Sequence, residues 1–157
     1  MELILLRHGK AEDHRSEGDF DRRLVDKGMR QARRAARLLG GLDRLPEVVL
    51  SSPRIRAKET AEHFCDEVGL GAPVIQSWLD CGMNPEEAMR ELAAFSEFER
   101  VMIVGHEPDF SMLVESWIEC RGGVEVKKGA LVGLEVMPPR RGGRLVFLVP
   151  PKMVGGS

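Results

Sequence analysis

Two short apolar runs in the chain each end at a histidine that lies beside a glycine. Residues 3–6 are followed by Arg7-His8-Gly9, and residues 101–104 are followed by Gly105-His106. Apolar runs of this length, bounded by such breaks, are typical of strands buried on both faces of a parallel sheet. Because ligands of open α/β sheets bind beyond the carboxyl ends of such strands, we expect both imidazoles at that edge.

Helical spacing of apolar residues alternates with these strand signals. Residues 26–39 predict a helix for which Asp26 can serve as the cap. Residues 52–68 predict a second helix, with Ser52 as its cap and Pro53 at its first position.

Strand and helix signals continue to alternate along the rest of the chain. They comprise short strands at 48–50 and 74–75, helices after Asn84 and after His106, and a hairpin of residues 131–136 and 144–149. This order predicts an α/β fold, a three-layer α-β-α sandwich with a mainly parallel central sheet. A chain of 157 residues fits one domain, 1–157.

The balance of charges excludes several classes of partner. Lys and Arg number 23 and Asp and Glu 25, which gives a net charge of −2. Such a chain has no overall attraction to nucleic acid or to a membrane surface, so we expect neither as a partner. Any affinity for anions must come from a local arrangement of residues.

The cysteines and the first residues indicate a cellular compartment. The chain begins with an acid, Glu2, and only four apolar residues before Arg7, which fits neither a signal peptide nor a membrane span. Cys65, Cys81 and Cys120 are widely spaced and form no CxxC pair, which argues against a disulfide framework or a zinc site. We therefore expect a cytoplasmic protein, and a monomer.

The first candidate for chemistry is Arg7-His8-Gly9. An arginine fork beside an imidazole suits an anionic group that the imidazole can attack. Gly9 permits a tight turn and the close approach of a ligand to the backbone. The alternative is a chance Arg-His pair at the end of a strand.

The second candidate is the basic start of the helix predicted at 52–68. Cations are unfavourable in the first turns of a helix, and a bound anion would reverse that balance. Arg54 and Arg56 lie about 200° apart around a helix axis, so one of them at most should point into a site. Arg56 adjoins the buried stripe and is assigned to the anion, and Arg54 to solvent or a partner. The alternative is that Arg54, Arg56 and Lys58 are all solvated surface charges.

The third candidate is Gly105-His106-Glu107-Pro108-Asp109, which again joins a buried strand to the start of a helix. Backbone amides near Glu107 could help to hold the same anion. A lone histidine here would more often be structural. Two histidines and an arginine at three strand-to-helix junctions favour a single anion site.

These stretches together resemble the histidine phosphatase superfamily, which includes the cofactor-dependent phosphoglycerate mutases, and within it the small SixA-like phosphohistidine phosphatase branch. The family's Arg-His-Gly signature stands here as Arg7-His8-Gly9. Its Ser-Pro-x-x-Arg-Ala-x-x-Thr-Ala stretch spans residues 52–61, and its Val-Gly-His-Glu-Pro-Asp segment spans residues 104–109. The resemblance implies the phosphoglycerate mutase-like form of the α/β fold.

The resemblance also implies roles for individual residues. His8 would be the nucleophile that becomes phosphorylated, Arg7, Arg56 and His106 would complete the phosphate pocket, and neither a metal nor another cofactor is required. Gly9 and Glu107 would contribute to substrate binding. Larger members carry a glutamate that protonates an alcohol leaving group, for which Asp80 and Glu12 are the candidates here. A missing strong acid favours N–P bonds over phosphate esters, because an imidazole, with a conjugate acid near pKa ~6.5, departs with little help.

These observations leave several hypotheses about function. The leading one is a metal-independent phosphatase that acts on phosphohistidine in a protein and releases phosphate. Alternatives are a broad small-molecule phosphomonoesterase of the same superfamily and a phosphate-binding module without turnover. A metallohydrolase is a further alternative, and its ligands would come from His8, Glu12, Asp13, His14, Asp19 and Asp21. This acidic group lacks a recognised ligand spacing and would leave Arg7 beside the cation.

Overall fold

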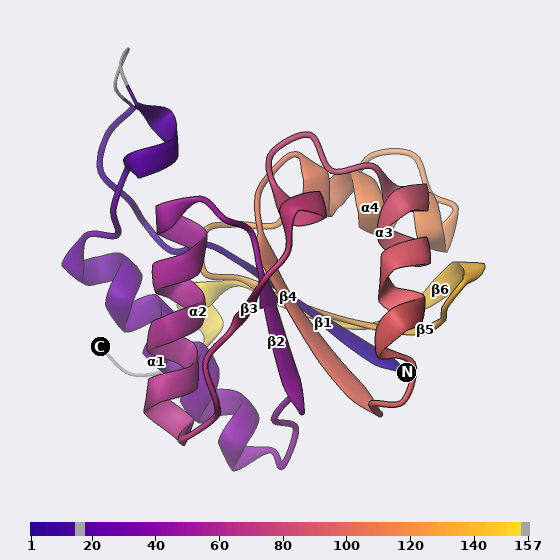
Figure 1. The fold of residues 1–157 in the computed structure, drawn as a ribbon, viewed down its shortest axis with the longest axis horizontal. Helices are drawn as coiled ribbons and strands as arrows, with labels where there is room; N and C mark the ends of the chain where they lie inside the picture. Colours follow the sequence, from indigo (N-terminus) through magenta and orange to yellow (C-terminus); the bar gives the residue numbers. More distant parts are fainter. Residues whose placement is uncertain (15–17, 155–157) are drawn as a thin grey trace.

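A six-stranded sheet runs through the described residues, 1–14 and 18–154, of the computed structural model (Figure 1). The strands are β1 (Glu2–Arg7), β2 (Val48–Ser51), β3 (Val74–Ile75), β4 (Arg100–Gly105), β5 (Leu131–Met137) and β6 (Arg140–Val149). They lie in the order β3-β2-β4-β1-β5-β6. The first four strands are parallel to one another, and the β5–β6 hairpin adds the antiparallel side. The expected mainly parallel sheet and the terminal hairpin are confirmed.

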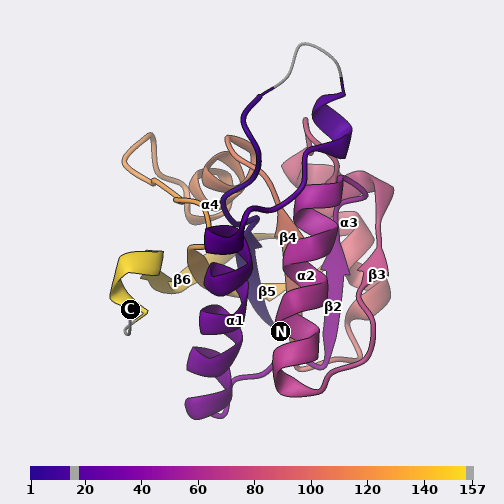
Figure 2. The same ribbon diagram turned by 90° about the vertical axis from the view of Figure 1, so that its left-hand side faces the viewer.

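Helices cover both faces of this sheet. They are α1 (Asp26–Gly41), α2 (Ile55–Val68), α3 (Pro85–Leu92) and α4 (Asp109–Ile118), and short 3₁₀ turns lie at Asp19–Asp21, Ser77–Leu79, Ala93–Phe95 and Pro151–Met153. Figures 1 and 2 show α1 and α2 on one face and α3 and α4 on the other, which confirms the three-layer sandwich. Within the described part of the chain, none of the helices is long and apolar enough to cross a membrane.

Burial on both faces explains the uninterrupted apolar run of β1. Leu3 and Leu5 pack with α3 and α4, whereas Ile4 and Leu6 pack with α1 and α2. All four side chains are completely buried. The same division holds along β4, so the two central strands form a rigid base from which His8 and His106 emerge.

Two of the predicted helix starts differ from the structure. The residue before α1 is Val25, with no side-chain cap, and Asp26 is already the first helical residue. Helix α2 begins at Ile55, two residues later than the predicted first position, Pro53. The Ser52 hydroxyl does accept the Arg54 N–H, at 3.2 Å, but the chain stays extended at Arg54. The predicted cap of α3 is confirmed, since the Asn84 side chain accepts two backbone N–H groups of its first turn.

The loop after β1 packs closely against α1 through two glycines. A Cβ atom on Gly9 would lie 2.6 Å from the carbonyl oxygen of Gly28, and one on Gly28 would lie 2.1 Å from the carbonyl oxygen of Lys10. That Lys10 carbonyl also accepts the N–H of Val25. The sequence analysis expected a ligand to approach the Gly9 backbone closely, and in the structure the backbone of Gly28 does so. The contact holds the loop that carries His8.

Gly28→Ala is expected to lower the free energy of unfolding by at least about 2 kcal/mol, since the new methyl group would meet backbone atoms that cannot yield. Gly40→Ala, also in α1, is the matched control. Its methyl group would meet only side-chain atoms at ordinary distances, 3.7 Å and more, so it should be neutral or stabilising by up to about 1 kcal/mol. Urea denaturation of both variants measures the difference, and equal stabilities would contradict the packing argument.

Candidate active site

The two histidines lie side by side at the carboxyl edge of the sheet. The pairing of β1 with β4 places Arg7 opposite Gly105, and the His8 N–H donates to the Gly105 carbonyl at 3.0 Å. The imidazole rings are 5.3 Å apart between centroids and tilted by 56°. His8 is 5% and His106 2% exposed. The expectation that both imidazoles lie at this edge is confirmed.

Hydrogen bonds determine which nitrogen of His8 is available. Its Nδ1 lies 2.8 Å from the Gly9 carbonyl oxygen, which can only accept, so Nδ1 carries the hydrogen. Its Nε2 then holds the lone pair, and the Nε–H of Arg56 donates to it at 3.3 Å. Burial, with smaller contributions from His106 and the arginines, lowers the pKa of His8 to about 3. At neutral pH the ring is an uncharged base with Nε2 facing the arginine.

Arg7 and Arg56 bring positive charge to this nitrogen. Arg56 is 4% exposed and donates through Nη1 to the backbone carbonyl of Asp19 at 2.9 Å. Arg7 donates through Nη1 to the carbonyl of Val126 at 2.9 Å, and its buried Nε has no hydrogen-bond partner among the described residues. Burial lowers the pKa of both guanidiniums, because a buried cation loses hydration that only a counter-anion can replace.

His106 carries a second buried nitrogen without a partner. Its Nε2 lies 2.8 Å from the Ser52 hydroxyl, whereas no described group bonds its buried Nδ1. Burial, then Arg56 and Arg54, lower the pKa of His106 to about 4. An unsatisfied buried polar atom costs about 1–3 kcal/mol, so the two in this region favour a ligand that bonds both. An oxyanion meets that requirement when His106 Nδ1 carries its hydrogen.

Ser52 and Thr60 are positioning residues for which the sequence analysis assigned no such role. The Thr60 hydroxyl accepts the Gly9 N–H at 3.1 Å and donates to the Arg56 carbonyl at 2.7 Å, so it connects the loop of His8 to the helix of Arg56. Ser52 supports His106 in the same way. Both residues belong to the stretch of residues 52–61 that resembles the family. From that stretch the sequence analysis predicted a helix cap at Ser52 and no role for Thr60.

Asp19 is a site residue that the sequence suggested only as a metal ligand. Its carboxylate accepts from Arg54 Nη1 at 2.7 Å, from Arg22 Nε at 2.9 Å and from Arg56 Nη2 at 3.3 Å. Burial raises the pKa of Asp19, but Arg56 and Arg22 outweigh it and bring the pKa to about 2. The carboxylate therefore stays ionised and partly neutralises the arginines at the entrance.

The assignment of Arg54 to solvent or a partner is wrong. Its Nε donates to Asp80 at 2.5 Å, and its Nη1 to Asp19. The angular argument that separated it from Arg56 assumed helical geometry at both positions, whereas Arg54 precedes α2 in an extended conformation. Its side chain is thus free to turn toward the same pocket as Arg56.

The remaining candidates occupy different places around this pocket. Asp80 is part of it and bonds both Arg54 and the Cys81 N–H. Burial raises the pKa of Asp80, but the bonds from Arg54 and the Cys81 N–H, together with nearby positive charge, outweigh it, and the pKa is lowered. The Glu12 carboxylate accepts the Arg23 N–H at 2.8 Å, and the Glu107 carboxylate accepts the Ser111 N–H at 2.7 Å. Both side chains stabilise backbone beside the pocket.

One trio of metal-type ligand atoms comes together among the described residues. Oxygen of Asp80, sulfur of Cys81 and nitrogen of His106 lie within 4.8 Å of one another. However, Arg54 bonds the Asp80 carboxylate, and Arg56 Nη2 lies 3.8 Å from the Cys81 sulfur. A cation here would face two guanidiniums. The residues proposed for a metallohydrolase do not form such a trio in the described part of the chain.

Comparison with known proteins identifies the family to which the chain is similar. Residues 3–80 match the model of the histidine phosphatase superfamily (branch 1). An uncharacterised protein from Picosynechococcus sp. is 31% identical over 144 residues, which cover 85% of this chain and 84% of the relative. A 2,3-bisphosphoglycerate-dependent phosphoglycerate mutase from Leifsonia xyli subsp. xyli is 40% identical over 80 residues. That alignment covers 48% of this chain and only 32% of the mutase.

Two solved structures are similar over nearly the whole chain. The protein histidine phosphatase SixA complexed with tungstate superimposes with a TM-score of 0.88 at 22% identity, covering 99% of this chain and all of the other. A SixA protein from Agrobacterium tumefaciens superimposes with a TM-score of 0.79 at 26% identity, covering 96% and 97%. The phosphoglycerate mutase-like fold is confirmed.

The buried, neutral histidines make stability depend on pH. The unfolded chain protonates these imidazoles near pH 6.5, whereas the folded chain holds their pKa at about 3 and 4. The unfolded state therefore binds more protons in between, and stability falls as pH drops below 6.5. Between pH 7 and pH 5 in phosphate-free buffer, His8 alone should account for roughly 1–2 kcal/mol, which His8→Gln removes. Denaturation at both pH values tests this, and nitrogen NMR should show Nδ1-protonated, neutral His8 at pH 5.

Proposed function

This chain belongs to the histidine phosphatase superfamily (branch 1), and from that membership we propose that it is a metal-independent protein phosphohistidine phosphatase with His8 as nucleophile. The observation that carries the proposal is the state of His8. Its Nδ1 is committed to the Gly9 carbonyl, while its Nε2 keeps a lone pair beside a buried arginine. A neutral, oriented imidazole in a cationic pocket suits attack on phosphorus.

In the first step, the Nε2 lone pair of His8 attacks the phosphorus of a phosphohistidine. The Nε2–P bond forms as the P–N bond of the substrate breaks, and the departing imidazole, which carries a hydrogen on its other nitrogen, keeps the electron pair and leaves as a neutral ring. Arg7 Nε, Arg56 and His106 Nδ1 are the groups that can donate to the phosphoryl oxygens. The Ser52 hydroxyl, which accepts the Arg54 N–H, can donate to His106 Nε2 and leave Nδ1 as a donor.

In the second step, water attacks the phosphorus of phosphorylated His8. The Nε2–P bond breaks, its electron pair returns to Nε2, and the water gives one proton to solvent, so neutral His8 and orthophosphate are regenerated. The Gly9 carbonyl accepts a hydrogen bond from Nδ1–H throughout. This bond is strongest in the phosphorylated state, because the ring is then more positive. The guanidiniums supply the neutralising charge that a metal ion supplies in other phosphoryl-transfer sites.

The carboxylates at the pocket favour a nitrogen leaving group. Asp80 and Asp19 both bond arginines, and the pKa of each carboxyl is lowered. Neither is therefore protonated at neutral pH to help an alkoxide depart. An imidazole departs without such help, since its conjugate acid has a pKa of ~6.5. This difference is our reason for placing phosphohistidine ahead of alkyl phosphates as substrate.

A broad small-molecule phosphomonoesterase is the second candidate. The similarity to a relative named as a phosphoglycerate mutase supports it, because that name describes an enzyme of small phosphate esters. A phosphate-binding module without turnover is the third candidate. Under the leading proposal, the partners are a phosphorylated histidine-containing protein and the phosphate released from it. We also propose a cytoplasmic monomer that needs no cofactor.

His8→Ala is expected to lower kcat by roughly 10⁴-fold or more while the fold is kept, because nothing else in the pocket can form the covalent intermediate. His63→Ala, on α2 where the ring contacts Arg33, is the matched control and should retain activity. Rapid quenching with labelled substrate should trap acid-labile, base-stable phosphate on His8. Vanadate should inhibit and EDTA should not. Label on another residue, or full turnover in His8→Ala, would refute the mechanism, and phosphate binding without turnover would identify the third candidate.

Substrate preference distinguishes the first two candidates. The wild-type kcat/KM for a phosphohistidine peptide should exceed that for an alkyl phosphate by roughly 100-fold or more, because no protonated acid serves the alkoxide. Because the Asp80 carboxyl is ionised beside Arg54, Asp80→Asn should not reduce hydrolysis of aryl and alkyl esters more than hydrolysis of phosphohistidine, and Glu12→Gln tests the other candidate acid in the same assay. Preferred turnover of alkyl esters by the wild-type protein would favour the phosphomonoesterase.

A further inference from the structure

A basic groove of about 410 Å³ opens beside Arg7, next to the candidate active site. Seven cationic residues and a single acidic residue, Glu125, line it. The cations come from the end of β1 and the loop after it, from α1, from the loop before β5 and from the last 3₁₀ turn. They are Arg7, Lys10, Lys27, Arg34, Lys127, Lys128 and, at the far end, Lys152.

The cations of this groove lack the carboxylate partners that several other cations of the protein have. Arg23 and Arg37 of the N-terminal half bond Glu59 and Glu67 on α2, and Arg144 bonds Glu135. Within the described residues, by contrast, none of the seven groove cations forms an ion pair with a carboxylate. A protein with a net charge of −2 thus concentrates unpaired positive charge in one place. Such a concentration attracts an anionic partner.

Backbone hydrogen bonds connect the groove to the nucleophile. The N–H of Gly129 donates to the carbonyl oxygens of both Arg7 and His8, at 3.1 and 3.2 Å. Gly129 has a positive φ of 80°, and its α-carbon packs against Gln31 of α1, where a Cβ would lie 2.9 Å from that side chain. The loop that carries Lys127 and Lys128 is therefore held at a constant position relative to His8. Gln31 in turn accepts the N–H of Lys10.

The size of the groove exceeds what a phosphoryl group requires. Lys27 and Arg34 are seven residues apart on α1, which separates them by about 10 Å along the helix. The cations crowd one another, and the pKa of Lys128 is lowered by burial and then by Arg7, Arg22 and Lys10. Several carboxylates, spaced along an extended segment, would match the cations along the groove better than one compact anion.

We propose that the basic groove docks an acidic segment of the phosphorylated protein, so that the substrate is a phosphohistidine flanked by aspartate and glutamate residues. This inference rests on the proposed function and adds to it a specificity determinant. Arg7 belongs both to the groove and to the phosphate pocket, so a segment in the groove leads directly to the phosphohistidine above His8. Docking through exposed charges should act mainly on KM and should weaken with salt.

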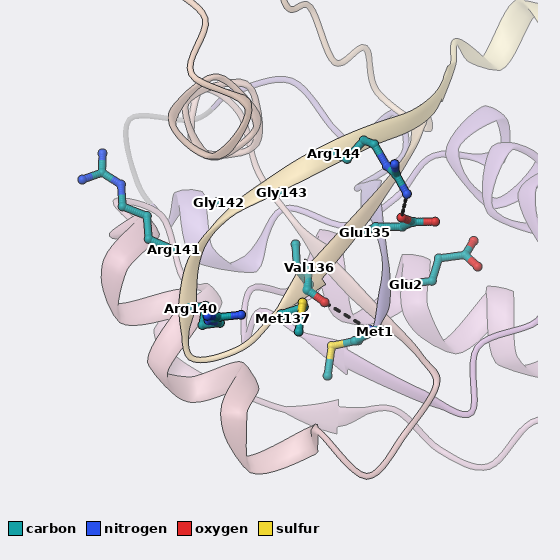
Figure 3. Close-up of a pocket in the computed structure, with 10 residues that line it drawn as sticks. All are labelled: Met1, Glu2, Glu135, Val136, Met137, Arg140, Arg141, Gly142, Gly143 and Arg144. Atoms are coloured by element: carbon teal, nitrogen blue, oxygen red, sulfur yellow. Dashed lines mark hydrogen bonds and ion pairs between the residues drawn. The ribbon is translucent and has the colours of Figure 1, made fainter.

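The test compares two charge-reversal variants. Lys27→Glu/Lys127→Glu changes two exposed cations of the groove. Arg140→Glu/Arg141→Glu makes the same change in charge at two exposed arginines of the β5–β6 hairpin, near the start of β1 (Figure 3). Binding of a fluorescent ten-residue Asp/Glu peptide and of a matched Gln/Ser peptide is measured by anisotropy. Neither peptide carries phosphate, so this binding is measured whether or not the proposed phosphatase activity holds.

We expect the groove variant to bind the acidic peptide at least tenfold more weakly, and the hairpin variant to stay within twofold of wild type. The KM for an acid-flanked phosphohistidine peptide should rise by a similar factor, while kcat for p-nitrophenyl phosphate stays within twofold. Equal binding of the two peptides, or equal loss in the two variants, would overturn the docking proposal. So would tighter binding of inorganic tripolyphosphate than of the peptide, because the groove would then suit a small polyanion.

Discussion

Pairing of β1 with β4 continues one residue beyond the strands, where the His8 N–H donates to the Gly105 carbonyl. Because parallel strands end at the same edge, this register places the residue after Arg7 beside the residue after Gly105. The buried apolar side chains on both faces prevent either strand from sliding, since a shift of one residue would exchange the two faces. The packing of the core therefore fixes the distance between the two imidazoles.

Charge in the candidate site is distributed so that His8 stays neutral while its surroundings stay positive. Burial disfavours protonation of His8 and His106, and the nearby arginines add to that effect. Asp19 bonds Arg54 and Arg56 at the entrance and limits the excess of positive charge. The result is a site in which an incoming anion, rather than a proton, restores the balance of charge.

The sequence predicts well what depends on local pattern and poorly what depends on contacts between distant segments. Strand edges could be predicted because a parallel strand buried on both faces is apolar throughout. The side chain of Arg56 lies beside His8, as its place next to the buried stripe of α2 predicted, whereas the direction of Arg54 was predicted wrongly because its backbone is not helical. The carboxylate of Asp19 and the hydroxyl of Thr60 act on residues more than 30 positions away, and no local periodicity reports such contacts.

The position of β4 in the sheet has a consequence for synthesis of the chain. Strands β1 and β2 are separated by about 40 residues and do not pair with each other, because β4 lies between them. A nascent chain that has emerged only as far as α3 therefore exposes two apolar strands with unpaired edges. Such edges favour association between chains, and long-range pairing is slow to form. Protection of these edges begins when β4 inserts between them, the same event that first brings the two histidines together.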